Sequence, residues 1–445
     1  MTVKQIFNTS AELDYPKVLP TLDLDFANSK TLDPRITFTR ASGGSYVGAD
    51  GLIKYAGVNE ARFDHDPETG ESLGLLIEES RTNLKIRSEE LQFDFGLGGA
   101  TTISENEIIS PDGTQNADGI VSNTNFSNHF KDKGFTSTSG ITASQNICCS
   151  AFFKKGVGRD VWLQIYAESG NAYHGVQFNF ETETLTFRNS DQYTTDGGVT
   201  TDYGVIKYPN GWYRLWVAGY PDTTTTGRRY RIRVTDASGS LDFSGDGVSS
   251  YVYVWGVQVE IGPSPTSYIP TQASTRTRRK DDAKITGKNV TDFYNINEST
   301  ILVEFIIRGM FSSGAFNIVL QLGQSPDSLL TTPLTLGENS TNLYDTFVLN
   351  GVQYFGFNTI LHSYGEKSNY VIALKENDSY RIAKISDRQE DISVNTTVPI
   401  SKFFPNTLGI GSQFSTGSRQ INGTISKITY YPKRLPNSQL QALIS

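Results

Sequence analysis

The sequence has almost no methionine or cysteine and carries little charge. Of its 445 residues, 2 are Met, 2 are Cys and 4 are His, and 19% are charged, against about a quarter in a typical soluble domain. Cys148 and Cys149 are adjacent in a strand-like run, where neighbouring side chains point to opposite faces. We therefore predict no disulfide framework and no zinc site. Stability must come from burial and strand pairing.

Features that mark several protein classes are also missing. No apolar run is long enough to span a bilayer. Residues 1–10 do not combine a basic region with an apolar run, so we expect no signal peptide. Helix and strand patterns do not alternate and no phosphate-binding glycine motif occurs, which argues against nucleotide-binding α/β folds. The formal net charge of −8 argues against nucleic acid or an anionic membrane as the main partner.

The abundant residues are those of an all-β protein. The chain has 41 Gly, 25 Phe and 22 Tyr; aromatic residues fill pleated surfaces, and glycine makes turns. Segments of alternating polarity, such as 161–166 and 176–180, recur roughly every ten residues over 146–260 and again over 300–431. This spacing predicts two jelly-roll or concanavalin A-like β-sandwiches in tandem after a small irregular N-terminal β region.

We expect four parts along the chain. Residues 1–84 form an N-terminal attachment and junction region with too little core to stand alone. Residues 85–270 form a jelly-roll β-sandwich, 271–298 a linker, and 299–445 a second sandwich that ends in a short helix. The linker holds a basic cluster, which adjacent acidic residues and a polar surrounding predict to be solvated: Arg276, Arg278, Arg279 and Lys280, followed by Asp281 and Asp282.

The stretch 61–84 crowds charged residues around the apolar block 73–77. A segment with this much charge beside this much apolar surface is typical of a joint that packs on one element and connects to another. We predict that it joins the N-terminal region to the first sandwich. The side chains expected to lock the joint are Arg62, Asp64, Glu78 and Arg81.

No catalytic residue is predicted. The pair Glu78 and Glu79 has the composition of a glycosidase acid–base pair, but neighbours on a strand point apart and cannot face one sugar. Salt bridges to Arg62 or Arg81 are the favoured interpretation. None of the four histidines lies in a known catalytic frame, and His65 is expected to make a structural hydrogen bond. We therefore expect a protein that is not an enzyme.

No metal ion or other cofactor is predicted. Two acidic loops, with Asp112 and Asp118 and with Asp242 and Asp246, contain oxygen ligands that suit Ca²⁺. They lack the spacing of an EF-hand, so solvated loops are the favoured interpretation.

The candidate binding residues lie on one strand of the first sandwich. If Val161 and its apolar neighbours face the core, then Trp162, Gln164 and Tyr166 share the opposite face. Such a row is a ligand platform for sugar rings, a subunit interface or a second buried face, and the sequence leaves these three open. The other tryptophans are expected in the core.

Several blocks of the sequence resemble tailed-phage structural proteins of the tail-fibre or carbohydrate-binding type. Segments 408–411 and 425–443 are similar to concanavalin A-like (laminin-G-like) lectin domains. The resemblance to the phage proteins lies in segments 22–27, 32–42, 61–64, 74–78 and 81–84, and that to a jelly-roll module in 210–214, 255–260 and 266–271.

This resemblance implies a virion protein, either a tail fibre or a related receptor-binding appendage. Its N-terminal region would attach to other virion proteins, and its sandwiches would adhere to host surface polysaccharide. It also implies a homotrimer, and adhesion strengthened by several copies. Two alternatives stay open: a capsid decoration or head fibre protein, and a glycan-degrading enzyme.

Overall fold

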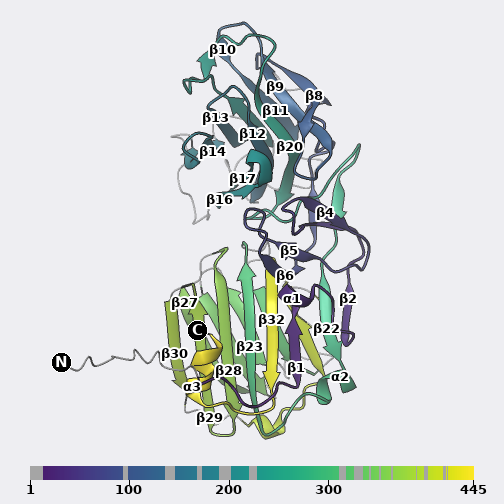
Figure 1. Cartoon of the computed structure of the whole chain (residues 1–445), viewed down its shortest axis with the longest axis vertical. Helices are drawn as coiled ribbons and strands as arrows, with labels where there is room; N and C mark the ends of the chain where they lie inside the picture. Colours follow the sequence, from purple (N-terminus) through teal and green to yellow (C-terminus); the bar gives the residue numbers. More distant parts are fainter. Residues whose placement is uncertain are drawn as a thin grey trace, which may run out of the picture.

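The computed structural model is built almost wholly of β-strands, as predicted, and stacks two β-sandwiches end to end (Figure 1). No helix in the described part of the chain is long and apolar enough to cross a membrane. The structure describes residues 14–93, 99–135, 146–167, 173–189, 202–219, 228–309, 317–324, 334–339, 342–349, 352–361, 364–386, 388–394, 399–413, 417 and 419–444.

The first sandwich consists of two antiparallel sheets around one apolar core. Inward residues of both sheets alternate with outward ones, which is why the period of two was visible in the sequence. The five-stranded sheet has the order β11 (Phe130–Phe135), β18 (Arg228–Val234), β13 (Asp160–Ala167), β14 (Tyr173–Asn179) and β15 (Thr184–Asn189). The six-stranded sheet has the order β16 (Tyr203–Tyr208), β17 (Trp212–Gly219), β12 (Ile147–Lys155), β20 (Ser250–Ile261), β9 (Gln115–Ser122) and β8 (Thr101–Ile109).

The second sandwich has larger sheets and a core of its own. One sheet has the order β30 (Arg388–Val394), β29 (Asp378–Ile385), β28 (Lys367–Lys375), β23 (Glu298–Ile307), β32 (Gly423–Tyr431), β6 (Ser72–Ile77) and β5 (Phe63–His65), with β1 (Leu22–Asp25) also paired to β32. The other has the order β2 (Ile36–Thr39), β22 (Asp282–Thr286), β31 (Thr407–Ile410), β24 (Asn317–Gly323), β25 (Leu334–Asn339), β26 (Asn342–Leu349) and β27 (Val352–Leu361).

The N-terminal strands are part of the second sandwich, which differs from the separate region expected for 1–84. Leu22 pairs with Tyr430, and Leu76 pairs with Thr424. Strand β2 likewise pairs with β22 at the edge of the other sheet. The physical reason is burial, because the apolar sides of these short strands lie in the core of the second sandwich. Residues 1–13 of the expected attachment arm lie outside the described residues.

The stretch 271–298, expected as a linker, is also part of the folded structure. It holds β21 (Arg276–Arg278), β22 and α2 (Lys288–Thr291). Strand β21 pairs with β7 (Arg81–Asn83), and β22 lies inside the seven-stranded sheet. The second sandwich is therefore discontinuous in sequence, and the first sandwich is inserted into it.

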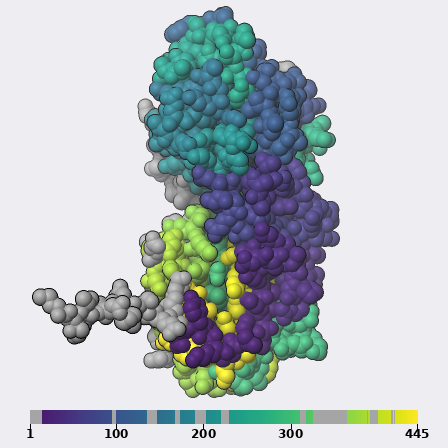
Figure 2. Space-filling model, in the orientation of Figure 1, coloured from purple at the N-terminus to yellow at the C-terminus, as the bar shows by residue number. Residues whose placement is uncertain are grey.

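Smaller elements fill the space between the sandwiches. The hairpin of β3 (Gly44–Val47) and β4 (Ile53–Ala56) packs Val47 and Ile53 against Trp212 and Trp255 of the six-stranded sheet, and so covers the outer face of that sheet. In Figure 2 this N-terminal part, in purple, fills the waist of the molecule. The remaining elements are α1 (Phe26–Ser29), η1 (Leu91–Phe93), β10 (Ser127–Asn128), η3 (Pro209–Gly211), β19 (Asp242–Phe243), η4 (Ile400–Lys402) and the C-terminal helix α3 (Asn437–Leu443).

Candidate functional site

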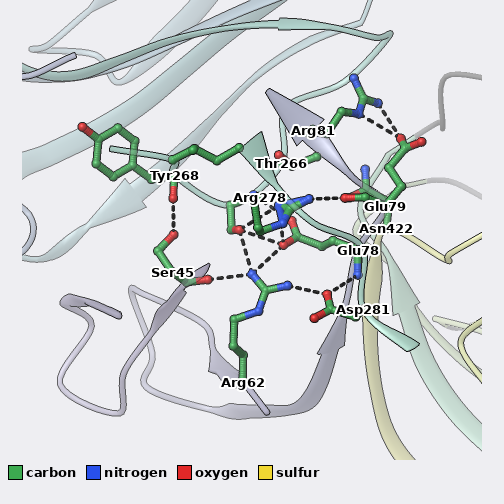
Figure 3. Close-up of polar contacts among 12 residues, drawn as sticks. Ser45, Arg62, Glu78, Glu79, Arg81, Thr266, Tyr268, Arg278, Asp281 and Asn422 are labelled. Atoms are coloured by element: carbon green, nitrogen blue, oxygen red, sulfur yellow. Dashed lines mark hydrogen bonds and ion pairs between the residues drawn. The ribbon is translucent and has the colours of Figure 1, made fainter. Parts of the chain in front are cut away.

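A buried ionic cluster lies where the strands of the second sandwich end and meet the first (Figure 3). Arg62 donates from Nη1 to Glu78 Oε2 at 2.7 Å and from Nη2 to Asp281 Oδ2 at 2.6 Å. Arg278 donates to the same Glu78 oxygen at 2.8 Å, and Arg40 donates to Asp281 Oδ1 at 3.1 Å. All five side chains are buried. We call these residues the junction cluster: Arg40, Arg62, Glu78, Arg278 and Asp281.

The junction cluster is assembled from sheet ends. Arg40 follows β2, Arg62 precedes β5, Glu78 follows β6 and Asp281 precedes β22. Ser267, from the segment after β20, donates to both carboxylate oxygens of Glu78. Charges that have been taken out of water must be paired to be tolerated. The cluster therefore ties four segments of chain together, and its burial suits a structural joint.

Two of the four predicted locking residues lie outside the junction cluster. Asp64 accepts from the backbone N–H of Val47 and forms an ion pair with Arg308 of the second sandwich at 2.5 Å. Arg81 pairs with Glu79 at 2.6 Å and also donates to the carbonyl of Ile261, the last residue of β20. Arg62 and Glu78 do meet directly. Glu78 and Glu79 thus have separate partners and do not face a common space.

Three members of the junction cluster were missed from the sequence. Arg278 is 1% exposed, although it belongs to the basic stretch that was expected to be solvated. Its neighbours in the chain are Thr277 and Arg279, and Arg276, two positions away, is exposed. Which of these arginines is buried depends on the pairing of β21 with β7. Alternation of side chains places Arg276 and Arg278 on the same side of the strand, so this pattern does not tell which of the two is buried.

Acid should weaken the junction cluster. Burial by itself raises the pKa of Glu78, but the charges of Arg278 and Arg62 outweigh it and hold the pKa below the ordinary 4.5. A depressed pKa stabilises the folded state above the unfolded-state value, and this stability is lost as the pH falls below it. We expect the free energy of unfolding, measured with urea from pH 7 to pH 3, to fall below pH 4.5.

The variant Glu78→Gln tests the assignment of this acid sensitivity. It should be less stable than the parent at pH 7, because two buried arginines then lack their carboxylate. It should also lose less additional stability on acidification, because Gln does not titrate. An equally steep pH dependence in both proteins would show that other carboxylates carry the effect.

The row of Trp162, Gln164 and Tyr166 lies on the outer face of the five-stranded sheet. Val161, Leu163 and Ile165 point inward and are fully buried in the core of the first sandwich. Trp162 and Tyr166 are partly exposed, whereas Gln164 is 1% exposed. The outer face of the partner sheet is covered by the hairpin β3–β4, and the face of β13 is the one that the hairpin leaves free.

Arginines flank this row on both sides. On β18, Arg233, Arg231 and Arg229 lie directly opposite Trp162, Gln164 and Tyr166. The Arg231 guanidinium is 4.6 Å from the ring centre of Tyr166 and 4.1 Å from that of Phe130. Arg188 on β15 and Arg233 stack on Trp162 at 5.6 and 5.8 Å. We call this surface the arginine–aromatic face; it comprises Trp162, Gln164, Tyr166, Arg188, Arg229, Arg231 and Arg233.

The side-chain amide of Gln164 lies at the centre of the arginine–aromatic face and makes no hydrogen bond within the described part of the chain. Neither of its amide atoms has a partner in the described part of the chain, and the indole N–H of Trp162 also lacks one. Gly175 lies directly opposite on β14 and adds no side chain there; a Cβ atom at this position would lie 2.8 Å from the Gln164 side chain. An unsatisfied buried polar group costs about 1–3 kcal/mol. Such groups are rare in folded proteins, and binding of a ligand or of water is one way in which they are satisfied.

The acidic loops considered for Ca²⁺ do not form a metal site among the described residues. No three His, Cys, Asp or Glu side chains there come together in a group that could hold an ion. Asp112 instead accepts hydrogen bonds from Ser110 and Thr114. Asp246 accepts from the hydroxyl of Ser249 and from the backbone N–H groups of Val248 and Ser249, which together lower its pKa to about 2.

Comparisons with known proteins identify no family for the chain. No family model matches it, and no curated protein does. Among solved structures, a mutant NanB sialidase from Streptococcus pneumoniae is 13% identical with a TM-score of 0.28. The match covers 35% of this chain and 25% of the sialidase chain. The CBM40 of the IT-sialidase of Ruminococcus gnavus, bound to α2,3-sialyllactose, is 12% identical with a TM-score of 0.27. This match covers 34% of the present chain and 84% of the CBM40 chain.

A third structure, the LG1–3 region of the laminin α2 chain, has 9% identity and a TM-score of 0.24, over 67% of this chain and 63% of that one. The chain thus spans about a quarter of the length of the sialidase it matches. All three identities are low and all three TM-scores are below 0.5. These similarities therefore carry no argument about residues or activity.

Proposed function

We propose that this chain is an adhesion protein of a tailed-phage particle and that it binds host surface polysaccharide through the arginine–aromatic face. The observation that carries the binding part is the partly exposed row of rings around the unpartnered amide of Gln164. Sugar rings stack on aromatic side chains, and amides hydrogen-bond to hydroxyl groups. The virion part rests on the resemblance of the N-terminal segments to phage structural proteins.

Adhesion fits the chemistry of the arginine–aromatic face better than catalysis does. A glycosidase needs two carboxyl groups that face one sugar. The described carboxylates beside this face are paired with arginines: Asp132 with Arg229 and Arg231, and Asp160 with Arg159. A flat sheet face also binds weakly per copy, which suits an oligomer that presents several copies. A homotrimer is part of this proposal.

Substitution of one ring tests the binding site. We expect Trp162→Ala to lower the affinity of the purified protein for its polysaccharide by roughly 10-fold, because the stacking surface is lost. The measurement is a glycan array followed by titration of the glycans that bind. Phe404→Ala is the matched control, because it removes an exposed ring from the second sandwich. Unchanged binding by Trp162→Ala, or an equal loss in both variants, would refute the assignment of the site.

The place of the protein on the particle tests the virion part separately. Gold-labelled antibody against the chain should mark the tail of the phage in electron micrographs. Label on the capsid would instead support the capsid decoration alternative. Release of sugars from a bound glycan by the purified protein would support the enzyme alternative.

A further inference from the structure

We infer that the polysaccharide recognised by the arginine–aromatic face is acidic and that its anionic groups are bound by the arginines of β15 and β18. This inference rests on the proposed function, because it names the class of glycan that the same face takes. It goes beyond glycan binding in general, because a neutral sugar can be bound by aromatic rings and amides, whereas an acidic glycan also requires a concentration of positive charge.

Positive charge is concentrated on this face of an acidic protein. Strand β18 places Arg229, Arg231 and Arg233 on one side, and β15 adds Arg188. Two carboxylates of the described residues share this side of the sheet: Asp132, which pairs with Arg229 and Arg231, and Asp160, which pairs with Arg159. The whole chain has a formal net charge of −8. A patch of the opposite sign selects anionic partners and repels cationic ones.

Among the described residues, Asp132 is the counterion of Arg229 and Arg231, and neither Arg188 nor Arg233 pairs with a carboxylate there. A single oxygen of Asp132, Oδ2, accepts from both Arg229 and Arg231, at 3.2 and 2.8 Å. Arg233 and Arg188 bond to neutral amide oxygens, those of Asn128 and Gln177. Burial together with the charge of Arg231 lowers the pKa of Arg233, which is the direction expected for a cation short of anions. A bound anion would relieve this repulsion.

The guanidinium groups are also held in position before any ligand binds. Arg231 is fixed by Asp132 and by the rings of Tyr166 and Phe130, and Arg188 by two bonds to Gln177 at 3.0 and 2.9 Å. Planar, preorganised guanidinium groups match the geometry of carboxylate and phosphate oxygens. Little side-chain entropy is then lost on binding. Arginines that are held against aromatic rings in this way can bind an anionic group while a neighbouring ring stacks on the sugar.

One row of residues across the five-stranded sheet places the side-chain amide of Gln164 beside the charged arginines. Asp132, Arg231, Gln164, Gly175 and Arg188 lie in register on the adjacent strands β11, β18, β13, β14 and β15. Gln164 therefore stands between two cations, and Gly175 leaves the position beside it without a side chain. The amide N–H groups of Gln164 are donors of the kind that a carboxylate between these arginines would use.

Paired polysaccharides with the same backbone provide the test. The full chain is titrated with polygalacturonate and its methyl ester, hyaluronan and its methyl ester, and dextran sulfate and dextran. The first two pairs probe carboxylates and the third probes sulfate. We expect at least one acidic member to bind roughly 10-fold more tightly than its neutral counterpart, and its affinity to fall as salt rises.

Two variants connect this preference to the face. Arg188→Gln, at an exposed position, should weaken binding of the acidic glycan by about 3-fold, and Arg188→Gln combined with Arg233→Gln by about 10-fold or more. Lys155→Gln is the control, because it removes a partly exposed charge from the six-stranded sheet of the same sandwich. Thermal unfolding of each variant shows whether it is folded, and Arg188→Gln carries the test if the double variant is not.

The outcomes separate this inference from the proposed function. Equal or tighter binding of the neutral members, with a loss in Trp162→Ala, overturns the acidic specificity and leaves glycan adhesion in place. An acidic preference that Lys155→Gln reduces as much as Arg188→Gln does overturns the assignment to this face. Binding of no polysaccharide on the panel overturns the proposed function together with the inference.

Discussion

Replacing Asp281 with alanine should lower the free energy of unfolding by about 3–5 kcal/mol. Asp281 accepts from Arg40 and Arg62 and also from the backbone N–H of Glu78. Its removal leaves the two guanidinium groups buried with less opposite charge, and an uncompensated buried charge costs more than the pair contributed. The loss would appear as a lower midpoint in urea unfolding of the full chain, with the slope unchanged.

The adjacent residue provides the control for Asp281→Ala. Asp282 pairs with Lys284 at 3.0 Å, and both of these side chains are partly exposed. An exposed ion pair contributes about 0–1 kcal/mol, so Asp282→Ala should cost no more than that. Similar effects of the two substitutions would contradict the large contribution to stability that is assigned to the junction cluster.

Gly74→Ala should cost at least about 3 kcal/mol. Gly74 lies in β6 with φ at +89°, a conformation that favours glycine. A Cβ atom there would lie 2.2 Å from the carbonyl oxygen of Ile425, which belongs to the paired strand β32. The backbone of β32 is not a flexible side-chain end, so β6 and β32 must move apart. The free energy of unfolding by urea measures the loss.

Gly287→Ala separates backbone strain from the clash. Gly287 also has a positive φ, +62°, but a Cβ atom there would meet nothing within 4 Å. With ψ at −132°, this variant should cost about 1–3 kcal/mol, the penalty of the conformation alone. A loss in Gly74→Ala no larger than that in Gly287→Ala would contradict the close approach of β6 and β32.

The architecture within each sandwich was predictable because it is local. Alternation along 161–166 and 176–180 reports directly which side chains face inward, and both segments are strands of the first sandwich. The alternation within a strand does not show which other strand it pairs with. The alternation of Leu22 and Leu24 with aspartates predicted a strand, yet its partner, which includes Tyr430, lies some four hundred residues away. The discontinuity of the second sandwich followed from such long-range pairings.

The candidate site was predictable in part for the same reason. Alternation placed Trp162, Gln164 and Tyr166 on one face, and it also showed arginine at every second position of 229–233. That these two faces coincide depends on the pairing of β13 with β18, which a single sequence does not show. The junction cluster was harder to predict, because the burial of Arg278 depends on four segments that meet in space.

The way β32 closes the second sandwich has a consequence for biosynthesis. This strand lies between β23 on one side and β1 and β6 on the other, and it is synthesised after all three of these partners. All strands of the first sandwich lie within residues 101–261, so they are synthesised well before β32. Contacts between distant parts of a chain form slowly because loop closure costs entropy. The inserted sandwich is therefore free to fold during translation, while β1 and β6 lack their partner until β32 has been synthesised.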